Sequence, residues 1–419
     1  MLATERYLFV IRDEVLWQFD IDTLQVVHQH RFPRTTPRAV AGAAPDAPVV
    51  EAPPVVAGRR AAAAEPPPSE LPKVEATTVG SAVDSALHWL ATHQDADGKW
   101  DCDQFMKHDA VGDPCEGPGN PVHDVGATGL SMLALLGSGS TLRQGPYKEH
   151  LKKAAKWLQE QQQENGLFGV NASHDFIYDH AIATYAMCEA YGLSNYQMLK
   201  PAAQKGLDYL ESHRNPYSVW RYQPRDNDND TSVTTWALLA MASGNQFGLN
   251  VNQEAMKIVG VWYDQVTTPD GRAGYTKAGE PSSRKPGDHS TRFPPESGEA
   301  MTAAALFGRL ILGQTKKDHP ILKVAADRVA AKPPQWQPGH VDAVYWFFGS
   351  FAMYQMGGKH WETWRRGLDE LVAHQQREGN AKGSWDPEGV WDEDGGRIFV
   401  TALYALSLQT AARAARLVR

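Results

Sequence analysis

A short acidic run offers the most specific chemistry in this chain. Asp226, Asp228 and Asp230 alternate with asparagines directly before an apolar segment that begins at Thr231. Carboxylates this close repel one another, which raises the pKa of some of them and suits them to act as general acids. An aspartate before a helix also caps its free N–H groups, so capping is the alternative for each residue. We take these three aspartates as the candidate catalytic residues.

Comparable residues stand just before, or at the start of, five further apolar segments, and each of these points carries a carboxylate. If all six segments are parallel helices of one ring, their N-terminal ends gather at one mouth, where a substrate could bind. The candidate substrate-binding residues at this mouth are Tyr178, Asp179, His180, Glu299, Asp342 and Asp394. Aromatic residues further along the segments could line a cavity or simply fill the core. Trp236, Tyr345 and Trp346 join the substrate-binding candidates on that basis.

The apolar segments alternate with amphipathic segments that share a repeated pattern. Three tryptophans are each followed nine positions later by a glycine, and the pairs are Trp89 and Gly98, Trp157 and Gly166, and Trp262 and Gly271. The first two copies also have a glutamine five positions after the tryptophan, Gln94 and Gln162, and a weaker C-terminal copy places Gln376 in that role. Such a repeat predicts a chain of similar helical hairpins.

The apolar segments are hydrophobic on nearly every side, so a helix formed from any of them must be buried. They cover residues 125–136, 180–192, 231–242, 299–312, 341–356 and 398–411. Six buried helices that alternate with six amphipathic ones close into two concentric rings. We therefore predict an all-α fold, an α6/α6 toroid, over residues 78–419.

The first 77 residues have a different character. Residues 1–32 alternate apolar and polar types and are rich in β-branched and aromatic side chains, which predicts a meander of two or three short β-strands. Residues 33–77 are rich in proline and alanine and have no helical period, which is typical of an extended linker. Neither segment carries residues arranged for chemistry.

Composition and charge exclude several classes of protein. The 419 residues carry a formal net charge of −8, which offers no basic surface to a nucleic acid. Three cysteines are too few for a disulfide scaffold. No apolar run is long enough for a transmembrane helix, and charges interrupt the N-terminal apolar runs where a signal peptide needs an unbroken one. We expect a soluble, cytoplasmic protein.

The pattern of an aromatic residue, a glutamine and Gly-x-Trp, clearest in Trp89, Gln94, Gly98 and Trp100, resembles the repeat of prenyltransferases and squalene cyclases. The resemblance extends from near Val79 to the C-terminus and is nearest to bacterial squalene-cyclase-like repeat proteins of unassigned activity. It implies a toroid whose central cavity binds an isoprenoid or a similar apolar lipid. In an enzyme it implies a cyclase of the isomerase class, and it implies no cofactor.

One departure from this family bears on the proton donor. The resembling cyclases take the initiating proton from the middle aspartate of an Asp-x-Asp-Asp run. Aligned on Thr231, that position is Asn229, which has no acidic proton. Cyclisation would therefore need Asp228 or Asp230 to donate the proton.

A second departure bears on metal. The resembling prenyltransferases bind zinc through Asp, Cys and His. Asp101 and Cys102, with Cys115, His108 and His123 nearby, look similar. They lie after the first amphipathic segment, however, whereas the ligands of that family come late in the chain. We therefore expect loop packing at these residues and no metal.

Two alternatives to a cyclase-like toroid remain open. The same toroid could be a non-catalytic module that binds a protein partner, which the loss of the acid at Asn229 favours. It could also be an α6/α6 carbohydrate enzyme with paired carboxylates. The Trp-Gln-Gly-Trp pattern favours the cyclase-like architecture over the carbohydrate enzyme, and the sequence leaves open whether the protein catalyses a reaction.

Overall fold

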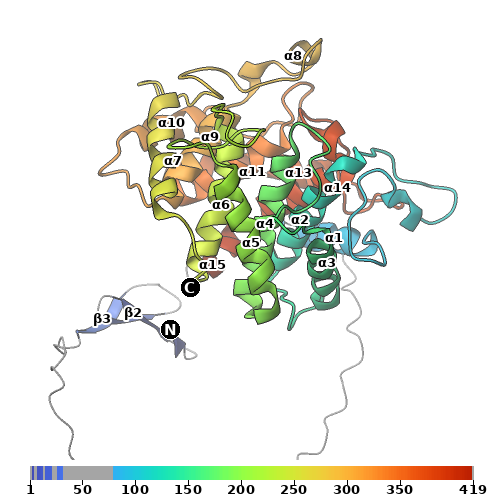
Figure 1. Ribbon diagram of the computed structural model, residues 1–419, viewed down its shortest axis with the longest axis horizontal. Helices are drawn as coiled ribbons and strands as arrows, with labels where there is room; N and C mark the ends of the chain where they lie inside the picture. Colours follow the sequence, from blue (N-terminus) through green and yellow to red (C-terminus); the bar gives the residue numbers. More distant parts are fainter. Residues whose placement is uncertain (1, 4–6, 13–14, 21–25, 32–78, 418–419) are drawn as a thin grey trace, which may run out of the picture. The chain divides into compact units, whose positions relative to one another are not determined.

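Figure 1 shows the computed structural model of the protein, which describes residues 2–3, 7–12, 15–20, 26–31 and 79–417. The chain divides into two compact units. The linker predicted over residues 33–77 lies outside the described residues and stays a prediction.

The N-terminal unit contains short antiparallel strands. In its described part these are β1 (Leu2–Ala3), β2 (Tyr7–Arg12), β3 (Val15–Asp20) and β4 (Val26–Arg31). They form one sheet in the order β1-β2-β3-β4. This is the meander that the alternating residues predicted, with one additional two-residue strand at its start.

Within residues 79–417, six buried helices form the inner ring of the second unit. They are α2 (Asp124–Gly137), α4 (Phe176–Ser194), α6 (Thr231–Gln246), α9 (Ala300–Ile311), α11 (Ala343–Met356) and α14 (Asp392–Leu408). Each packs against the next in this order, and α14 packs against α2, which closes the ring. The predicted all-α toroid is therefore confirmed.

Amphipathic helices surround this inner ring. They are α1 (Val79–Thr92), α3 (Lys148–Gln161), α5 (Lys200–His213), α7 (Gln253–Val266), α10 (Ile321–Ala330), and the pair α12 (Gly358–Gly367) and α13 (Asp369–His374), which share the last outer position. The outer helix α1 packs against α14, α2 and α13, so the first and last repeats are neighbours. None of the helices in the described part of the chain is long and apolar enough to cross a bilayer.

Shorter elements connect the two rings. They are η1 (Phe105–His108), η2 (Pro121–His123), η3 (Gln197–Leu199), α8 (His289–Arg292) and η4 (Pro295–Ser297). The C-terminal helix α15 (Thr410–Leu417) follows α14. Its Arg413 donates to the carbonyl oxygen of Leu133 on α2 at 2.9 Å and forms a buried ion pair with Glu189 on α4.

The turns from an outer helix into the following inner helix, here called joints, explain the repeated glycines. Gly98, Gly166 and Gly383 have φ values of +111°, +95° and +98°, a region that favours glycine. A Cβ atom on Gly166 would lie 2.2 Å from the carbonyl oxygen of Lys205 on α5. The glycine is therefore required both by its backbone conformation and by the close approach of the next outer helix.

The repeated glutamines fasten each joint to its neighbour. Gln94 and Gln162 each donate two hydrogen bonds through Nε2, one to the glycine carbonyl of their own joint and one to a carbonyl of the next outer helix. In the last joint Gln375 makes these bonds, to Gly383 and to Ala82 of α1, both at 2.8 Å. The prediction of Gln376 was wrong because the longer turn between glutamine and glycine obscured the register.

Aromatic side chains of the inner helices pack across the interior of the ring. Trp236 on α6 stacks on Phe347 on α11, with 5.2 Å between ring centroids, although α9 lies between these helices in the ring. Phe347 contacts Phe351, which stacks on Phe307 of α9 at 5.3 Å. None of the four side chains is more than 6% exposed. This aromatic ladder occupies space that a large apolar ligand in the interior would need.

Candidate active site at the mouth of the toroid

The N-terminal ends of the inner helices meet at one end of the ring, here called the mouth. His123, just before α2, binds Asp179 of α4 at 3.0 Å. Tyr178 of α4 binds Ser232 of α6 at 2.5 Å. Backbone hydrogen bonds likewise join the segment before α14 to the segment before α11, and the first turns of α14 to the segment before α2. The ring therefore gathers the acidic residues that stand at the starts of these helices.

Asp230 is a fully buried carboxyl group at the start of α6. Its Oδ1 accepts hydrogen bonds from the backbone N–H of Val233 and the hydroxyl of Ser232, both at 2.8 Å, and so caps the helix. Its Oδ2 has only long contacts, 3.5 Å to the hydroxyl of Tyr275 and 3.7 Å to Nε of Arg221. Burial raises the pKa of Asp230 to about 6. One oxygen therefore caps the helix, and the other faces Tyr275 and Arg221.

Tyr275 and Arg221 contact this second oxygen, Tyr222 binds Tyr275, and Tyr178 binds Ser232 beside it. We call Tyr178, Tyr222, Tyr275 and Arg221 the tyrosine cluster. The hydroxyls of Tyr222 and Tyr275 bond to each other. The guanidinium of Arg221 lies 5.2 Å from the ring centroid of Tyr222 and 5.4 Å from that of Tyr275. Its Nε atom is buried and has no hydrogen-bond partner. The cluster thus combines aromatic faces, hydroxyl groups and one unsatisfied cationic donor.

Asp228 and Asp226 occupy the exposed loop above the cluster. Oδ2 of Asp228 lies 3.1 Å from NH1 of Arg221, and the Asp228 side chain is 67% exposed. Asp226 is also exposed, and its Oδ1 accepts a hydrogen bond from the backbone N–H of Asp228 at 2.9 Å. Asp228 and Asp230 therefore contact one guanidinium, whereas Asp226 shapes the loop.

Amide side chains hold this loop in place. Oδ1 of Asn229 accepts hydrogen bonds from the backbone N–H of Val219 and from Nδ2 of Asn215, both at 3.2 Å. Arg225 and Asn227 adopt positive φ values of 56° and 66°. Asn229, at the position where the resembling cyclases carry their acid, therefore holds the loop in this protein.

His123 and Asp179 form a separate ion pair between α2 and α4. Nδ1 of His123 lies 3.0 Å from Oδ2 of Asp179. Burial by itself lowers the pKa of His123, but the hydrogen bond and charge of Asp179 outweigh it and raise the pKa to about 9. The pair lies at the mouth, where a ligand could contact it.

His180 has both ring nitrogens engaged inside the wall of the ring. Its Nδ1 accepts a hydrogen bond from the backbone N–H of Phe168 at 3.0 Å, and its Nε2 donates to the carbonyl oxygen of Gly206 at 3.1 Å. Burial lowers its pKa to about 3, so the ring is neutral. These contacts join a joint to an outer helix and leave no ring nitrogen for a substrate.

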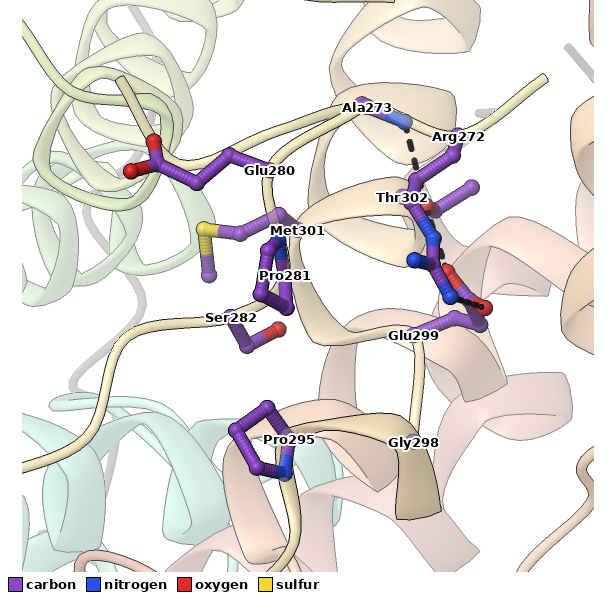
Figure 2. A pocket seen from close by; sticks show the side chains of 10 residues that line it. All are labelled: Arg272, Ala273, Glu280, Pro281, Ser282, Pro295, Gly298, Glu299, Met301 and Thr302. Atoms are coloured by element: carbon purple, nitrogen blue, oxygen red, sulfur yellow. Dashed lines mark hydrogen bonds and ion pairs between the residues drawn. The ribbon is translucent and has the colours of Figure 1, made fainter. Parts of the chain in front are cut away.

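Glu299 lies among cations at the start of α9. Its Oε1 contacts Arg272, Arg328 and Lys332 at 3.0 to 3.1 Å. Burial by itself raises the pKa of Glu299, but the hydrogen bonds and charges of Arg272 and Lys332 outweigh it and lower the pKa. Figure 2 shows Arg272 reaching Glu299 beside a recess that Met301 also lines. The recess encloses about 10 Å³, room for about one water molecule.

The acids near α11 and α14 have separate partners. Asp342 is buried and caps α11, since its Oδ1 accepts a hydrogen bond from the backbone N–H of Tyr345 at 2.9 Å. Asp394 pairs with Lys285 at 2.6 Å. Asp392 is buried, burial raises its pKa to about 8, and its Oδ1 has no hydrogen-bond partner. None of these contacts includes a member of the tyrosine cluster.

The three aromatic candidates lie within the packed interior. Trp236 belongs to the aromatic ladder. The hydroxyl of Tyr345 donates to the carbonyl oxygen of Lys332 at 2.8 Å, and Trp346 lies 5.6 Å from the ring of Tyr404. All three side chains are buried, so their contacts are those of core residues.

The residues compared with a zinc site are not brought together as a set. Asp101 pairs with two lysines, and His108 and His123 each bind a different aspartate. Cys102 is buried in the core. Only Cys115 of this set lies within a group of ligand-type side chains among the described residues.

Sequence reasoning missed three members of the tyrosine cluster. Arg221 and Tyr222 stand five and four positions before Asp226, and their types alone could have marked them. Tyr275 belongs to the next joint and meets Asp230 across 45 positions of sequence. No local pattern links those two residues.

Comparisons with known proteins define the fold and leave the substrate open. No protein-family model matches the sequence, and no curated protein matches it. The GH76A α-1,6-mannanase of Salegentibacter sp. is similar in structure with a TM-score of 0.54 and 12% identity, covering 81% of this chain and 99% of that chain. Cellobiose 2-epimerase of Bacillus thermoamylovorans has a TM-score of 0.53 and 13% identity, covering 80% and 98%.

The type II terpene cyclase MstE of Scytonema is similar to the same extent. Its TM-score is 0.50 and its identity 15%, and the match covers 80% of this chain and 98% of that chain. Enzymes of different chemistry thus share this α/α toroid. At such low identity the likeness establishes the fold and carries no substrate or residue role with it.

Proposed function

We propose that this toroid is an acid–base enzyme whose site is the tyrosine cluster, with Asp230 as general acid and Asp228 as general base. The observation that carries the proposal is the contrast between the two carboxyls that share Arg221. Asp230 is buried with a pKa of about 6, whereas Asp228 is exposed and paired with the arginine. Enzymes divide acid and base roles by placing two carboxyls in such different environments.

We infer a hydroxylated small molecule, such as a sugar, as the substrate. Tyrosine hydroxyls, a guanidinium and carboxylates beside aromatic faces can bind both the hydroxyl groups and the C–H faces of a sugar. A carboxyl with a pKa of about 6 suits proton transfer to an oxygen atom, and it is a weaker acid than an ordinary aspartic acid for protonating a carbon–carbon double bond. The Trp-Gln-Gly-Trp pattern no longer weighs against this class, because its residues hold the joints.

A second candidate is the isoprenoid-binding, and cyclising, toroid that the sequence resemblance implies. The observation in its favour is the aromatic ladder of Trp236, Phe347, Phe351 and Phe307, since ring faces can stabilise a carbocation. These rings pack against one another, so an isoprenoid in the interior would have to displace them. The tyrosine cluster lies at the mouth beside the exposed Asp228, so the first candidate leaves the aromatic ladder in place.

The test compares the two substrate classes on the same protein. The purified chain is incubated with cellobiose and α-1,6-mannotriose, and separately with squalene and geranylgeranyl diphosphate, and products are identified by mass spectrometry. Asp230→Asn keeps the helix cap but has no proton to donate, so we expect sugar conversion to fall by about 10²- to 10⁴-fold. Asp208→Asn, at an exposed residue of α5 that binds Gln204, is the matched control and should leave the rate unchanged.

The pH profile and the product decide between outcomes. If Asp230 is the acid, the rate of sugar conversion should fall as pH rises through about 6, because the carboxyl then loses its proton. Full activity of Asp230→Asn would overturn its role. A cyclised product from squalene, without sugar conversion, would favour the second candidate. If no compound of either class is converted, the result would contradict both candidates as enzymes and leave the protein-binding alternative.

A further inference from the structure

Three side chains that could hold a metal ion come together in the loop after α1. They are His93, Asp109 and Cys115, and one ligand atom from each lies within 4.8 Å of the others. Among the described residues no other group of three histidine, cysteine, aspartate or glutamate side chains meets this spacing. None of the three takes part in the tyrosine cluster, so the inference is independent of the proposed function.

All three side chains are buried. His93 and Cys115 are each 5% exposed, and the side chain of Asp109 is 2% exposed. The ring of His93 stacks on Trp89 with 4.0 Å between centroids, and Phe105 lies against both rings. Polar groups buried beside aromatic rings are costly unless they are paired or bind an ion.

The hydrogen bonds of His93 favour a cation at its Nε2 atom. Its Nδ1 lies 2.7 Å from the carbonyl oxygen of Trp89, which can only accept, so Nδ1 carries a hydrogen and donates it. The opposite nitrogen, Nε2, faces Oδ1 of Asp109 at 3.0 Å. A bare ring nitrogen and a carboxylate oxygen repel at that distance unless a proton or a metal ion joins them. A backbone carbonyl that fixes the tautomer is the usual partner of a metal-binding histidine.

The loop that carries the other two side chains is already held in place. Oδ2 of Asp109 accepts a hydrogen bond from the backbone N–H of Cys115 at 2.5 Å, and Sγ of Cys115 lies 3.4 Å from Oδ1. Asn380 of the last joint binds the backbone N–H of Ala110 at 3.1 Å. Arg397 donates to the carbonyl oxygen of Glu116 at 2.6 Å. Both ends of the loop are therefore anchored.

We propose that His93 Nε2, Asp109 Oδ1 and Cys115 Sγ bind one zinc ion, with solvent as the fourth ligand. Nitrogen, oxygen and sulfur together are a donor set typical of zinc. Tetrahedral zinc holds its ligand atoms about 3.5 Å apart, so these atoms are close to the required spacing. The residues between Asp109 and Cys115 are exposed and give the ion a way in from solvent.

Metal binding to the full-length chain tests this proposal. The protein is stripped with a chelator and titrated with Zn²⁺, bound metal is counted by mass spectrometry, and Co²⁺ serves as a spectroscopic probe. We expect one zinc per chain and a cobalt–thiolate charge-transfer band. Cys115→Ser should abolish that band and weaken zinc binding by about 100-fold or more. Cys102→Ser, at a buried cysteine outside the group, should keep both.

X-ray absorption of the zinc-loaded wild-type protein needs no variant and covers the case in which Cys115→Ser does not fold. One sulfur and three nitrogen or oxygen neighbours would support the site. A zinc with no sulfur neighbour, a chain that binds no zinc, or a band that persists in Cys115→Ser would each overturn it. His93 and Asp109 would then form an ion pair only.

Discussion

The joints and the mouth lie at the same end of the helices, but the joints repeat the same contacts whereas the contacts at the mouth differ from repeat to repeat. At the joints, the repeated glutamines tie a glycine carbonyl to the next outer helix in the same way each time. At the mouth every repeat carries an acid, yet the partners differ. Asp230 meets tyrosines and an arginine, Glu299 meets three cations, and Asp342 caps its helix. Repetition thus marks the residues that hold the ring, and departure from it marks candidates for chemistry.

The largest effect on stability is expected from a substitution at a joint glycine. Gly166→Ala places a Cβ 2.2 Å from a carbonyl oxygen at a φ of +95°, so we expect a loss of about 4 kcal/mol in unfolding free energy. Gly112→Ala is the matched control, since its φ is +97° and nothing lies within 4 Å. It should lose only about 1 kcal/mol. Equal losses in urea unfolding would mean that the close approach does not matter.

At the mouth, the contribution of one acid to stability can be tested at the His123–Asp179 pair. The folded pKa of His123, about 9, exceeds the ordinary value of 6.5, so its stabilisation is present below about 6.5 and lost as pH rises through 9. His123→Ala should therefore cost about 3 kcal/mol at pH 6, and the difference should shrink toward pH 9.5. His174→Ala, at an exposed mouth histidine, is the control and should be neutral. A pH-independent difference in thermal unfolding would contradict the ion pair.

Substitutions of Gln375, which makes the repeated hydrogen bonds, and of its neighbour Gln376 can be compared directly. Gln375→Ala removes two buried hydrogen bonds and should cost about 2 kcal/mol. Gln376→Ala removes one bond to Asp386 at a less buried site and should cost less than about 1 kcal/mol. Chemical denaturation of both variants measures the difference. A larger loss at Gln376 would restore the original alignment.

The smallest expected effect on stability tests whether Asp230 acts as an acid or only caps α6. Burial raises the pKa of Asp230 from 3.8 to about 6, so the folded state binds more protons than the unfolded state between these values. Stability should then fall as pH rises through this window. Asp230→Asn keeps a cap without charge and should be about 1 to 2 kcal/mol more stable than the wild type at pH 8, but not at pH 4. Loss of stability at both pH values would indicate a cap alone.

The toroid was predictable from sequence because its inner helices are apolar on every side. The segment 341–356, for example, had to be buried, and α11 was found at Ala343–Met356. Asp230 was predictable as an acid from its spacing, but its surroundings were not, because Tyr275 reaches it from a different repeat. His93 and Asp109 escaped notice for the same reason, since their pairing depends on how a loop folds back over α1.

The contacts between the first and last repeats have a consequence for how the protein unfolds. Gln375 bonds to Ala82 of α1, and Nε1 of Trp89 bonds to the carbonyl oxygen of Asn380 at 2.8 Å. In an open array of repeats the terminal units fray and stability adds unit by unit. A closed ring has no terminal unit, so it should melt in a single cooperative transition. A circularly permuted chain, opened at another joint, should therefore rebuild the same ring.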